Sequence, residues 1–198
     1  MLTKTVKHTL LLMLLMLLTA GITSQAMAEA VKYQFDIRGQ HAFVQFKIKH
    51  LGYSWLLGEF NKFDGSFMLD NDDITRSSVT ATIDTTSLDS NHAERDKHLK
   101  GSDFLDVGKY PTATFTSKRI EKTADGFNII GELNLHGVTR EITIAAQKIG
   151  EGKDPWGGYR AGFEGHTTLK LADFGINYNL GPASTQVELN LYVEGVRQ

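Results

Sequence analysis

The stretch from Ser90 to Phe115, SNHAERDKHLKGSDFLDVGKYPTATF, concentrates the side chains that could carry chemistry. Two histidines stand there among alternating acidic and basic residues, whereas the chain on either side alternates apolar and polar residues. Metal ligands on one helix need spacings of three or four residues to share a face. His92 and His98 are six residues apart, which places them about 240° apart around a helix. This spacing argues against a shared metal ion, and the remaining histidines are scattered.

Acid–base and nucleophilic catalysis are not favoured either. Glu94, Asp96 and Asp103 interleave with lysines and an arginine, the pattern of a solvated face with offsetting charges. The stretch 52–56, GYSWL, is the nearest match to a G-x-S-x-G nucleophile elbow, but a leucine replaces its second glycine. The glycine-rich stretch around Pro155 lacks the Lys-Ser/Thr pair of a phosphate-binding loop. We therefore predict no catalytic residues and no metal site.

Residues 1–28 have the composition of a secretory signal peptide. Two lysines precede an unbroken apolar run, Leu10–Leu18, and Ala26-Met27-Ala28 offers a cleavage site. The run is well short of the roughly 18 apolar residues needed to span a bilayer. We expect cleavage after Ala28, which leaves residues 29–198 as one exported domain.

The remaining chain is mildly acidic and contains no cysteine. Removal of residues 1–28 takes away two lysines and no acid, so the formal net charge falls from −2 to −4. Without a clustered basic excess we expect no nucleic-acid partner. The absence of cysteine excludes disulfides, thiolate nucleophiles, Cys zinc sites and a lipid-modified cysteine. No later stretch is apolar and long enough to span a membrane, and a domain of this length can be stable through its core alone.

A hydrophobic period of two runs through most of the domain and predicts strands with one apolar face. Turn residues at 70–73, 124–126, 136–137 and 150–158 separate them. Strands this close in sequence must pair antiparallel, because a parallel return needs a crossover of a dozen residues or more. We predict an all-β antiparallel meander, which fits either a sandwich or a closed up-and-down barrel. The expected strands are residues 32–38, 42–48, 63–69, 79–85, 113–117, 127–135, 138–144, 159–171 and 187–193.

One short helix is expected at Asn91–Lys100. Asn91 is the expected N-cap, with Glu94 as its reciprocal partner, and Gly101 ends the helix. Residues 102–105 could begin a second short turn, and Tyr110-Pro111 forces extended backbone before the next strand. A single helix between two strands of a barrel is well placed to cover an open end.

The aromatic content leaves the interior undecided between filled and hollow. Eleven phenylalanines, six tyrosines and two tryptophans all follow residue 28. A closed eight-stranded barrel either fills with side chains or holds one small ligand. Gly65, Gly131 and Gly165 lie on apolar strand faces, where they either leave space inside or mark bulges and sharp bends. The residues alone support both explanations equally.

Four separated blocks carry a resemblance to a known family. They are His50–Gly65 (HLGYSWLLGEFNKFDG), residues 87–115 (SLDSNHAERDKHLKGSDFLDVGKYPTATF), Gly131–Thr139 (GELNLHGVT) and Ala172–Ile176 (ADFGI). Their order across Val31–Val196 resembles the YceI-like family of bacterial exported proteins. Two departures are visible: Asn134-Leu135-His136 replaces a frequent Thr-Ile, and Ala172 replaces a basic residue. The first affects a hairpin and the second the charge at the channel mouth, so both bear on head-group preference.

The resemblance implies an eight-stranded, lipocalin-like barrel with an elongated apolar channel and a short helical lid. It implies a non-catalytic carrier in the periplasm that binds polyisoprenoid chains, quinones with such tails, prenyl pyrophosphates, or fatty acids and amides, and that can pair as dimers. Neither a metal nor a dedicated cofactor belongs to the family pattern. Two alternatives are an enzyme acting on a quinone or lipid in the same channel and an interaction protein with a packed core.

The resemblance also suggests where a ligand would bind. We expect the lid to be Asn91–Leu105, with Leu99, Phe104 and Leu105 turned inward. The head-group candidates are His50, Arg95, Lys97 and His98, because a pyrophosphate or quinone carbonyl needs hydrogen-bond donors; a merely solvated charged face is the alternative for the three lid residues. The predicted channel lining, which will include some plain core residues, is Val44, Phe46, Ile48, Phe60, Phe63, Phe67, Ile83, Phe104, Phe115, Ile129, Leu133, Phe163 and Leu189.

Overall fold

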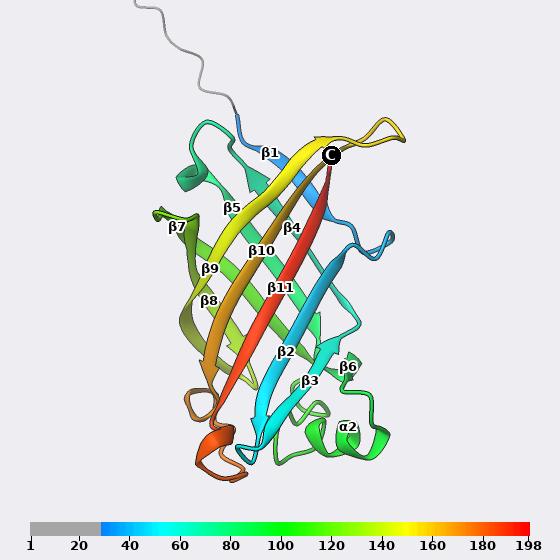
Figure 1. Cartoon of the computed structure of the whole chain (residues 1–198), viewed down its shortest axis with the longest axis vertical. Coiled ribbons are helices and arrows are strands. Elements are labelled where there is room, and N and C mark those ends of the chain that lie inside the picture. The colour runs from blue at the N-terminus through cyan, green and yellow to red at the C-terminus, as the bar shows by residue number, and fades with distance from the viewer. Residues whose placement is uncertain (1–28) are drawn as a thin grey trace, which may run out of the picture.

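The computed structural model describes residues 29–198, which form a single closed β-sheet with one short α-helix (Figure 1). The predicted signal peptide, residues 1–28, lies outside the described residues. The helix is α2 (Ala93–Leu99), and short 3₁₀ turns occur at η2 (Ile74–Arg76), η3 (Thr85–Ser87), η4 (Leu171–Phe174) and η5 (Pro182–Ser184). The strands are β1 (Val31–Phe35), β2 (Ala42–His50), β3 (Ser54–Phe60), β4 (Phe63–Leu69), β5 (Ser78–Asp84), β6 (Leu88–Asp89), β7 (Thr112–Lys122), β8 (Phe127–Leu135), β9 (Val138–Lys153), β10 (Tyr159–Lys170) and β11 (Gln186–Arg197).

The sheet closes because β1 pairs with β11. The order around the ring is β1-β4-β5-β7-β8-β9-β10-β11, and every pairing is antiparallel. β1 and β2 both pair with β11, one after the other, and β4 and β3 pair with β1 and β2 in turn. β1 and β2 therefore share one strand position of an eight-stranded barrel, and β3 and β4 share the next. The prediction of an all-β, up-and-down eight-stranded barrel is confirmed.

Several strands differ from the sequence-based expectation, and β1, β9 and β3 show the physical reasons. The first strand ends at Phe35 rather than residue 38, because the Asp36 carboxylate accepts a bond from Gly39 N (3.0 Å) and turns the chain out before β2. β9 continues to Lys153, into the stretch expected to be a loop. β3 was not predicted, since its sequence SWLLGEF does not alternate: Leu57 lies beside Leu56 but is 64% exposed.

The helix starts two residues later than expected. His92, not Asn91, is the N-cap, and its Nδ1 accepts a hydrogen bond from Arg95 N (3.3 Å). Asn91 instead adopts a left-handed conformation with φ of 62°, which asparagine tolerates better than most residues. Its N–H donates to Asp89 Oδ1 (2.7 Å), so Asn91 forms the turn that precedes the helix.

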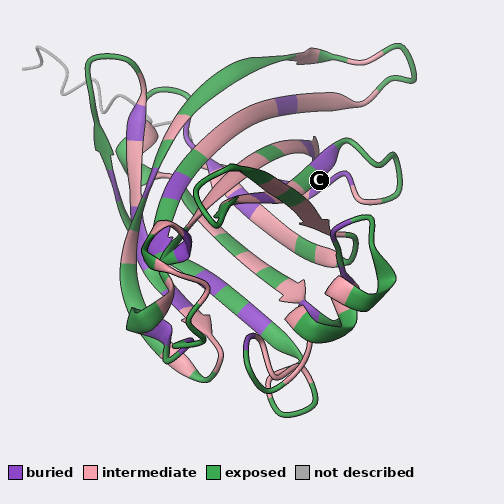
Figure 2. Cartoon of the chain, turned by 60° about the horizontal axis from the view of Figure 1, so that its bottom comes forward, coloured by how far each residue is buried: buried purple, intermediate pink, exposed green. Residues whose placement is uncertain are grey.

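Aromatic packing closes the end of the barrel where β1 lies, opposite α2 (Figure 1). Tyr33 is 2% exposed and stacks on Phe67 with ring centroids 5.0 Å apart. Phe163 meets Phe67 edge-on at 5.3 Å, and Phe35 contacts the same ring at 6.3 Å. Along the strands buried and exposed residues alternate, as the period of two requires (Figure 2).

The glycines on the apolar faces serve two purposes. A methyl group at Gly65 would lie 2.4 Å from Phe35, and one at Gly131 would lie 2.6 Å from Phe115, so these two glycines make room for a neighbouring ring. Gly131 also pairs with Ser117 at a bulge in β7. Gly165 lines the cavity, where a methyl group would lie 2.9 Å from Ile144 Cγ2. Both explanations considered from the sequence therefore apply, at different positions.

Candidate functional site

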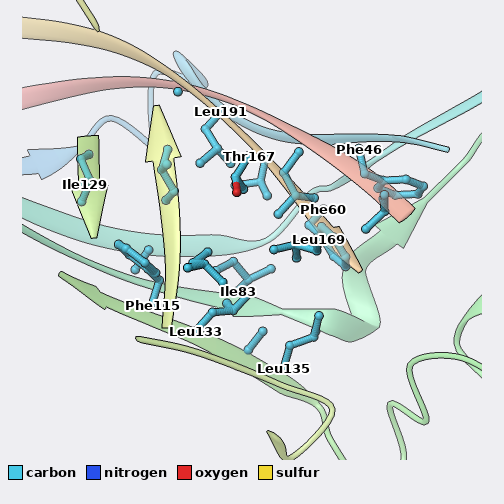
Figure 3. A pocket seen from close by; sticks show the side chains of 18 of the residues that line it. Phe46, Phe60, Ile83, Phe115, Ile129, Leu133, Leu135, Thr167, Leu169 and Leu191 are labelled. Atoms are coloured by element: carbon cyan, nitrogen blue, oxygen red, sulfur yellow. The ribbon is translucent and has the colours of Figure 1, made fainter. Parts of the chain in front are cut away.

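The barrel encloses a cavity of about 300 Å³ with an almost entirely apolar wall (Figure 3). Aliphatic and phenyl side chains from each strand of the described sheet line it. An engineered apolar cavity of about 150 Å³ is already enough to bind benzene and to stay free of water. The space inside this barrel is therefore large enough for an apolar ligand.

The cavity brings together all of the predicted channel residues except Phe63. Phe63 is half-buried, packs against the cluster around Tyr33, and borders a shallow surface depression next to Lys62 and Asp64. Phe63 pairs in register with Ile83, which does line the cavity, so the strand position alone does not determine the lining. Phe63 is therefore removed from the predicted lining.

Several lining residues were not predicted. Leu56 belongs to the strand that the sequence pattern missed, and Ile176 and Leu180 belong to the loop between β10 and β11, where no periodicity exists to find them. The other unpredicted lining residues lie on the same strand faces as predicted ones. The period of two was therefore sufficient to identify them. They include Leu135, Ile142, Ile144, Leu169 and Leu191.

The predicted lid, Asn91–Leu105, lies at the end of the barrel that we call the mouth (Figure 1). Leu99, Phe104 and Leu105 all line the cavity, as expected, and Phe104 is 7% exposed. The ring of Phe104 also contacts Tyr178, from the loop between β10 and β11, at a centroid distance of 5.0 Å. An aromatic contact thus connects the lid to a second segment that borders the mouth.

Of the head-group candidates, only His50 lines the cavity, at the end of β2. Lys97 is exposed on the outer side of α2 and does not line it. His98 is also outside, where its Nε2 lies 3.2 Å from Asp103 Oδ2 and its ring packs edge-on against Phe104 and Tyr178. The charged side chains of the helix therefore do not reach the enclosed space.

Arg95 has a structural partner at the start of the lid. Its Nε donates to Ser90 Oγ (2.7 Å), and its Nη2 donates to the Ser90 carbonyl oxygen. Asp96 Oδ1 accepts bonds from the Ser90 N–H (2.8 Å) and hydroxyl (2.5 Å). Ser90 is 3% exposed, so this network fixes where the lid leaves the barrel.

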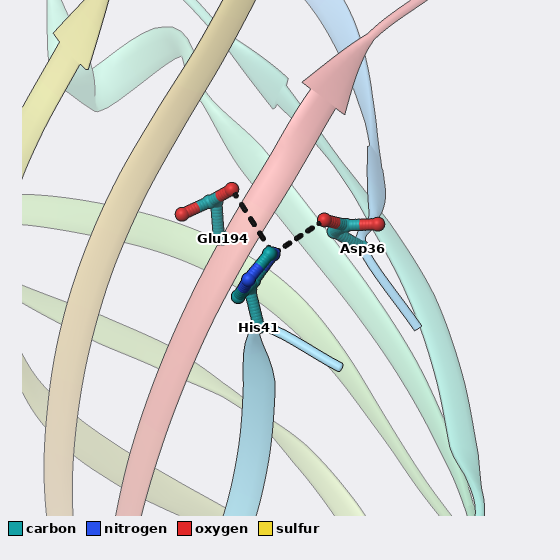
Figure 4. Close-up of side chains that lie close together, drawn as sticks. All are labelled: Asp36, His41 and Glu194. Atoms are coloured by element: carbon teal, nitrogen blue, oxygen red, sulfur yellow. Dashed lines mark hydrogen bonds and ion pairs between the residues drawn. The ribbon is translucent and has the colours of Figure 1, made fainter. Parts of the chain in front are cut away.

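The structure also gathers a charged cluster that sequence spacing did not reveal (Figure 4). His41 Nδ1 lies 2.9 Å from Asp36 Oδ2 and 3.7 Å from Glu194 Oε1. Such a trio could hold a metal ion in principle, but Arg160 already donates to both carboxylates at 2.5 Å and to Asp154 at 2.8 Å. None of these residues lines the cavity. The cluster instead ties together β10, β11 and the break between β1 and β2.

The cluster shifts the titration of Asp36. Burial alone would raise the pKa of this carboxyl, but hydrogen bonds from His41 and Arg160 outweigh burial and lower the pKa from 3.8 to about 2. The same carboxylates raise the pKa of the Arg160 guanidinium. Asp36 and Arg160 are thus oppositely charged at neutral pH, which suits a structural clamp.

The sequence of this chain is similar to a protein family and to individual bacterial proteins. The model of the YceI-like domain family matches residues 33–195. A UPF0312 protein of Pseudomonas paraeruginosa is 59% identical over 182 residues, which cover 92% of this chain and 93% of that protein. No helix in the described part of the chain is long and apolar enough to cross a membrane.

Two solved structures share the fold. A YceI protein of Campylobacter jejuni superimposes with a TM-score of 0.69 at 29% identity, covering 76% of this chain and 90% of that one. A polyisoprenoid-binding domain from Saccharophagus degradans gives a TM-score of 0.59 at 16% identity, covering 85% and 99%. The second likeness, at such low identity, concerns the fold alone.

Proposed function

The chain belongs to the YceI-like family, and from this premise we propose that it is a non-catalytic carrier that binds long isoprenoid or similar amphiphilic lipids in its barrel. The observation that carries the proposal is the cavity of about 300 Å³ with its hydrocarbon wall. The polyisoprenoid-binding neighbour from Saccharophagus degradans supports it by sharing the barrel. We also propose that the signal peptide predicted at residues 1–28 directs export of the protein into the periplasm.

The energetics of burial suit such a ligand. Each methylene moved from water to an apolar site contributes about 0.8 kcal/mol, so a five-carbon prenyl unit contributes roughly 4 kcal/mol. Association costs on the order of 4–15 kcal/mol in lost freedom. A few buried prenyl units therefore suffice for tight binding without any specific polar contact.

A catalytic role has less support. The titratable residues among those that line the cavity are Lys49, His50 and Glu164. The Glu164 carboxylate accepts a hydrogen bond from Gln147 on the outer surface, and the other two lie at the end of β2. This arrangement offers no matched acid and base around an enclosed substrate. The family and the fold are of the binding-protein type.

The proposal is tested by narrowing the cavity. Ala81 lines it from β5, whereas its neighbour Thr80 is exposed on the outer face. We expect Ala81→Trp to weaken binding of a fluorescent polyprenyl probe at least tenfold, with Thr80→Trp as the matched control at wild-type affinity. Equal affinity of the two variants for the probe would show that the lipid binds elsewhere.

A further inference from the structure

One buried hydroxyl group in the cavity wall has no hydrogen-bond partner among residues 29–198. Thr167 is 6% exposed, and its side chain points into the cavity from β10 (Figure 3). Among the described residues, none bonds its Oγ1. The other buried or half-buried hydroxyls of the wall are engaged: Ser77 accepts from a backbone N–H at 2.9 Å, while Thr85 and Ser184 donate to backbone carbonyls at 2.7 and 2.5 Å.

No side-chain nitrogen or oxygen in the described part of the chain is both fully buried and unpaired, so Thr167 Oγ1 borders the open space of the cavity, where a ligand can reach it. Burial of a hydroxyl group without a partner costs free energy, and native interiors pair most of their buried polar atoms. A valine would fill the same volume at this position without that cost. The hydroxyl at Thr167 therefore suggests that a polar atom of the ligand completes its hydrogen bonding.

Thr167 lies in the half of the barrel next to the mouth. It pairs in register with Leu189 of β11, which pairs with Phe46 of β2. Lys170, at the end of β10, is three positions further along the chain, a distance of about 10 Å along the strand. A ligand whose tail fills the cavity would bring its first polar atom to this level.

The surroundings at this depth favour an uncharged head group. The lid presents Leu99, Phe104 and Leu105 to the cavity, and Lys49 and His50 lie at the end of β2 rather than deep inside. A phosphate beside Thr167 would be a buried charge without a cationic partner, which proteins avoid. A neutral alcohol, phenol or ring carbonyl needs only the single hydrogen bond that Thr167 can make.

We propose that Thr167 is the polar contact for an uncharged, oxygen-bearing head group, and that this contact makes the protein prefer isoprenoid alcohols or quinones to isoprenoid diphosphates. This inference rests on the proposed function, since it assumes that an isoprenoid occupies the barrel. It adds the position of the head group, below the lid, and the chemical class that the site selects.

The test compares three probes with one tetraprenyl chain: geranylgeraniol, geranylgeranyl diphosphate and the corresponding hydrocarbon. Binding of each to purified, delipidated protein is measured by competition with a fluorescent lipid. We expect Thr167→Val to bind the alcohol about tenfold more weakly than wild type, the change expected when one buried hydrogen bond is lost. Binding of the hydrocarbon should be unchanged or tighter, and Thr167→Ser should retain alcohol binding.

Thr168→Val is the matched control, because Thr168 is the exposed neighbour on the same strand. It should leave all three affinities unchanged. The inference is overturned if wild type binds the diphosphate as tightly as the alcohol, or if Thr167→Val binds the alcohol as wild type does. Failure of wild type to bind even the hydrocarbon would instead overturn the proposed function.

Discussion

The ring of Phe46 lies over the backbone of Gly58 on the neighbouring strand: a methyl group at Gly58 would be 2.3 Å from Phe46 Cζ. Phe67 of β4 likewise approaches Gly195 of β11, across the intervening strand β1, where a methyl group would lie 2.4 Å from its ring. Each ring takes the space that a side chain at the glycine would fill, so it lies closer to the wall than it otherwise could. Glycine–phenylalanine pairs thus help to keep an aromatic-rich barrel hollow.

Gly58→Ala should therefore destabilise the protein and narrow the cavity. The methyl group would also lie 2.7 Å from the Asp89 carbonyl oxygen, so the strand cannot simply shift away. Overpacking of this kind costs about 1–3 kcal/mol, measurable by urea unfolding. Gly150→Ala on β9 is the control, since nothing lies within 4 Å of a methyl group there. Equal stability of the two variants would contradict the packing described.

The contact between Phe104 and Tyr178 should hold the lid closed. Aromatic pairs contribute about 0.5–1.5 kcal/mol beyond their buried area, so Tyr178→Ala should release a bound lipid several-fold faster. Stopped-flow transfer of a fluorescent lipid to vesicles measures this rate. Tyr53→Ala, at a tyrosine 88% exposed in the β2–β3 hairpin, should release it at the wild-type rate. Identical rates for both variants would show that the contact does not gate release.

Asp36 should make stability depend on pH in the acid range. Its pKa in the folded protein is about 2, below the ordinary value of 3.8. The stabilisation from the charged carboxylate is therefore complete above about pH 4 and is lost as the pH falls toward 2. Asp36→Asn should be less stable at neutral pH and should lose less stability over that interval.

Thermal unfolding between pH 2 and 7 checks this expectation, with Asp125→Asn in the exposed β7–β8 turn as control. The control should follow the wild-type curve. If Asp36→Asn also follows it, the cluster around Arg160 does not contribute as its geometry indicates.

Arg95 should act on the lid rather than on the ligand. Its loss would leave the buried Ser90 carbonyl without its guanidinium donor, and Arg95→Ala should raise hydrogen exchange in the lid while the barrel strands stay protected. Lys97→Ala, at an exposed position two residues along, should change nothing. A tenfold loss of lipid affinity with unchanged exchange would instead support Arg95 as a head-group contact.

Most of the barrel could be predicted from the sequence because its physical cause is local. A strand with one buried face must alternate, and Ala42–Ile48 and Phe127–Leu135 do so at most positions, with Phe43 and Ile130 as exceptions. β3 could not be predicted because Leu57 is apolar but exposed. The apolar and polar residues of this strand therefore do not indicate which of its positions are buried. The early end of β1 depends on the Asp36 side chain and on charges from β10 and β11, which no local pattern contains.

The site could be predicted only in part, for a related reason. Inward positions follow from alternation, so Phe115 and Leu133 were found, whereas Ile176 and Leu180 enter the wall from an irregular loop. The apolar lid residues were identified, but the direction of Arg95 is fixed by a hydrogen bond to Ser90 that depends on the turn at Asn91. Alternation also cannot tell a filled barrel from a hollow one, because both have the same inward face.

The most direct test of the carrier proposal is native mass spectrometry, with lipid extraction, of protein purified from a bacterial periplasm without detergent. We predict an added mass that corresponds to one long-chain isoprenoid lipid, present in wild type and Thr80→Trp and absent from Ala81→Trp. A wild-type protein that carries no lipid, and that takes up none when mixed with isoprenoid vesicles, would contradict the proposal.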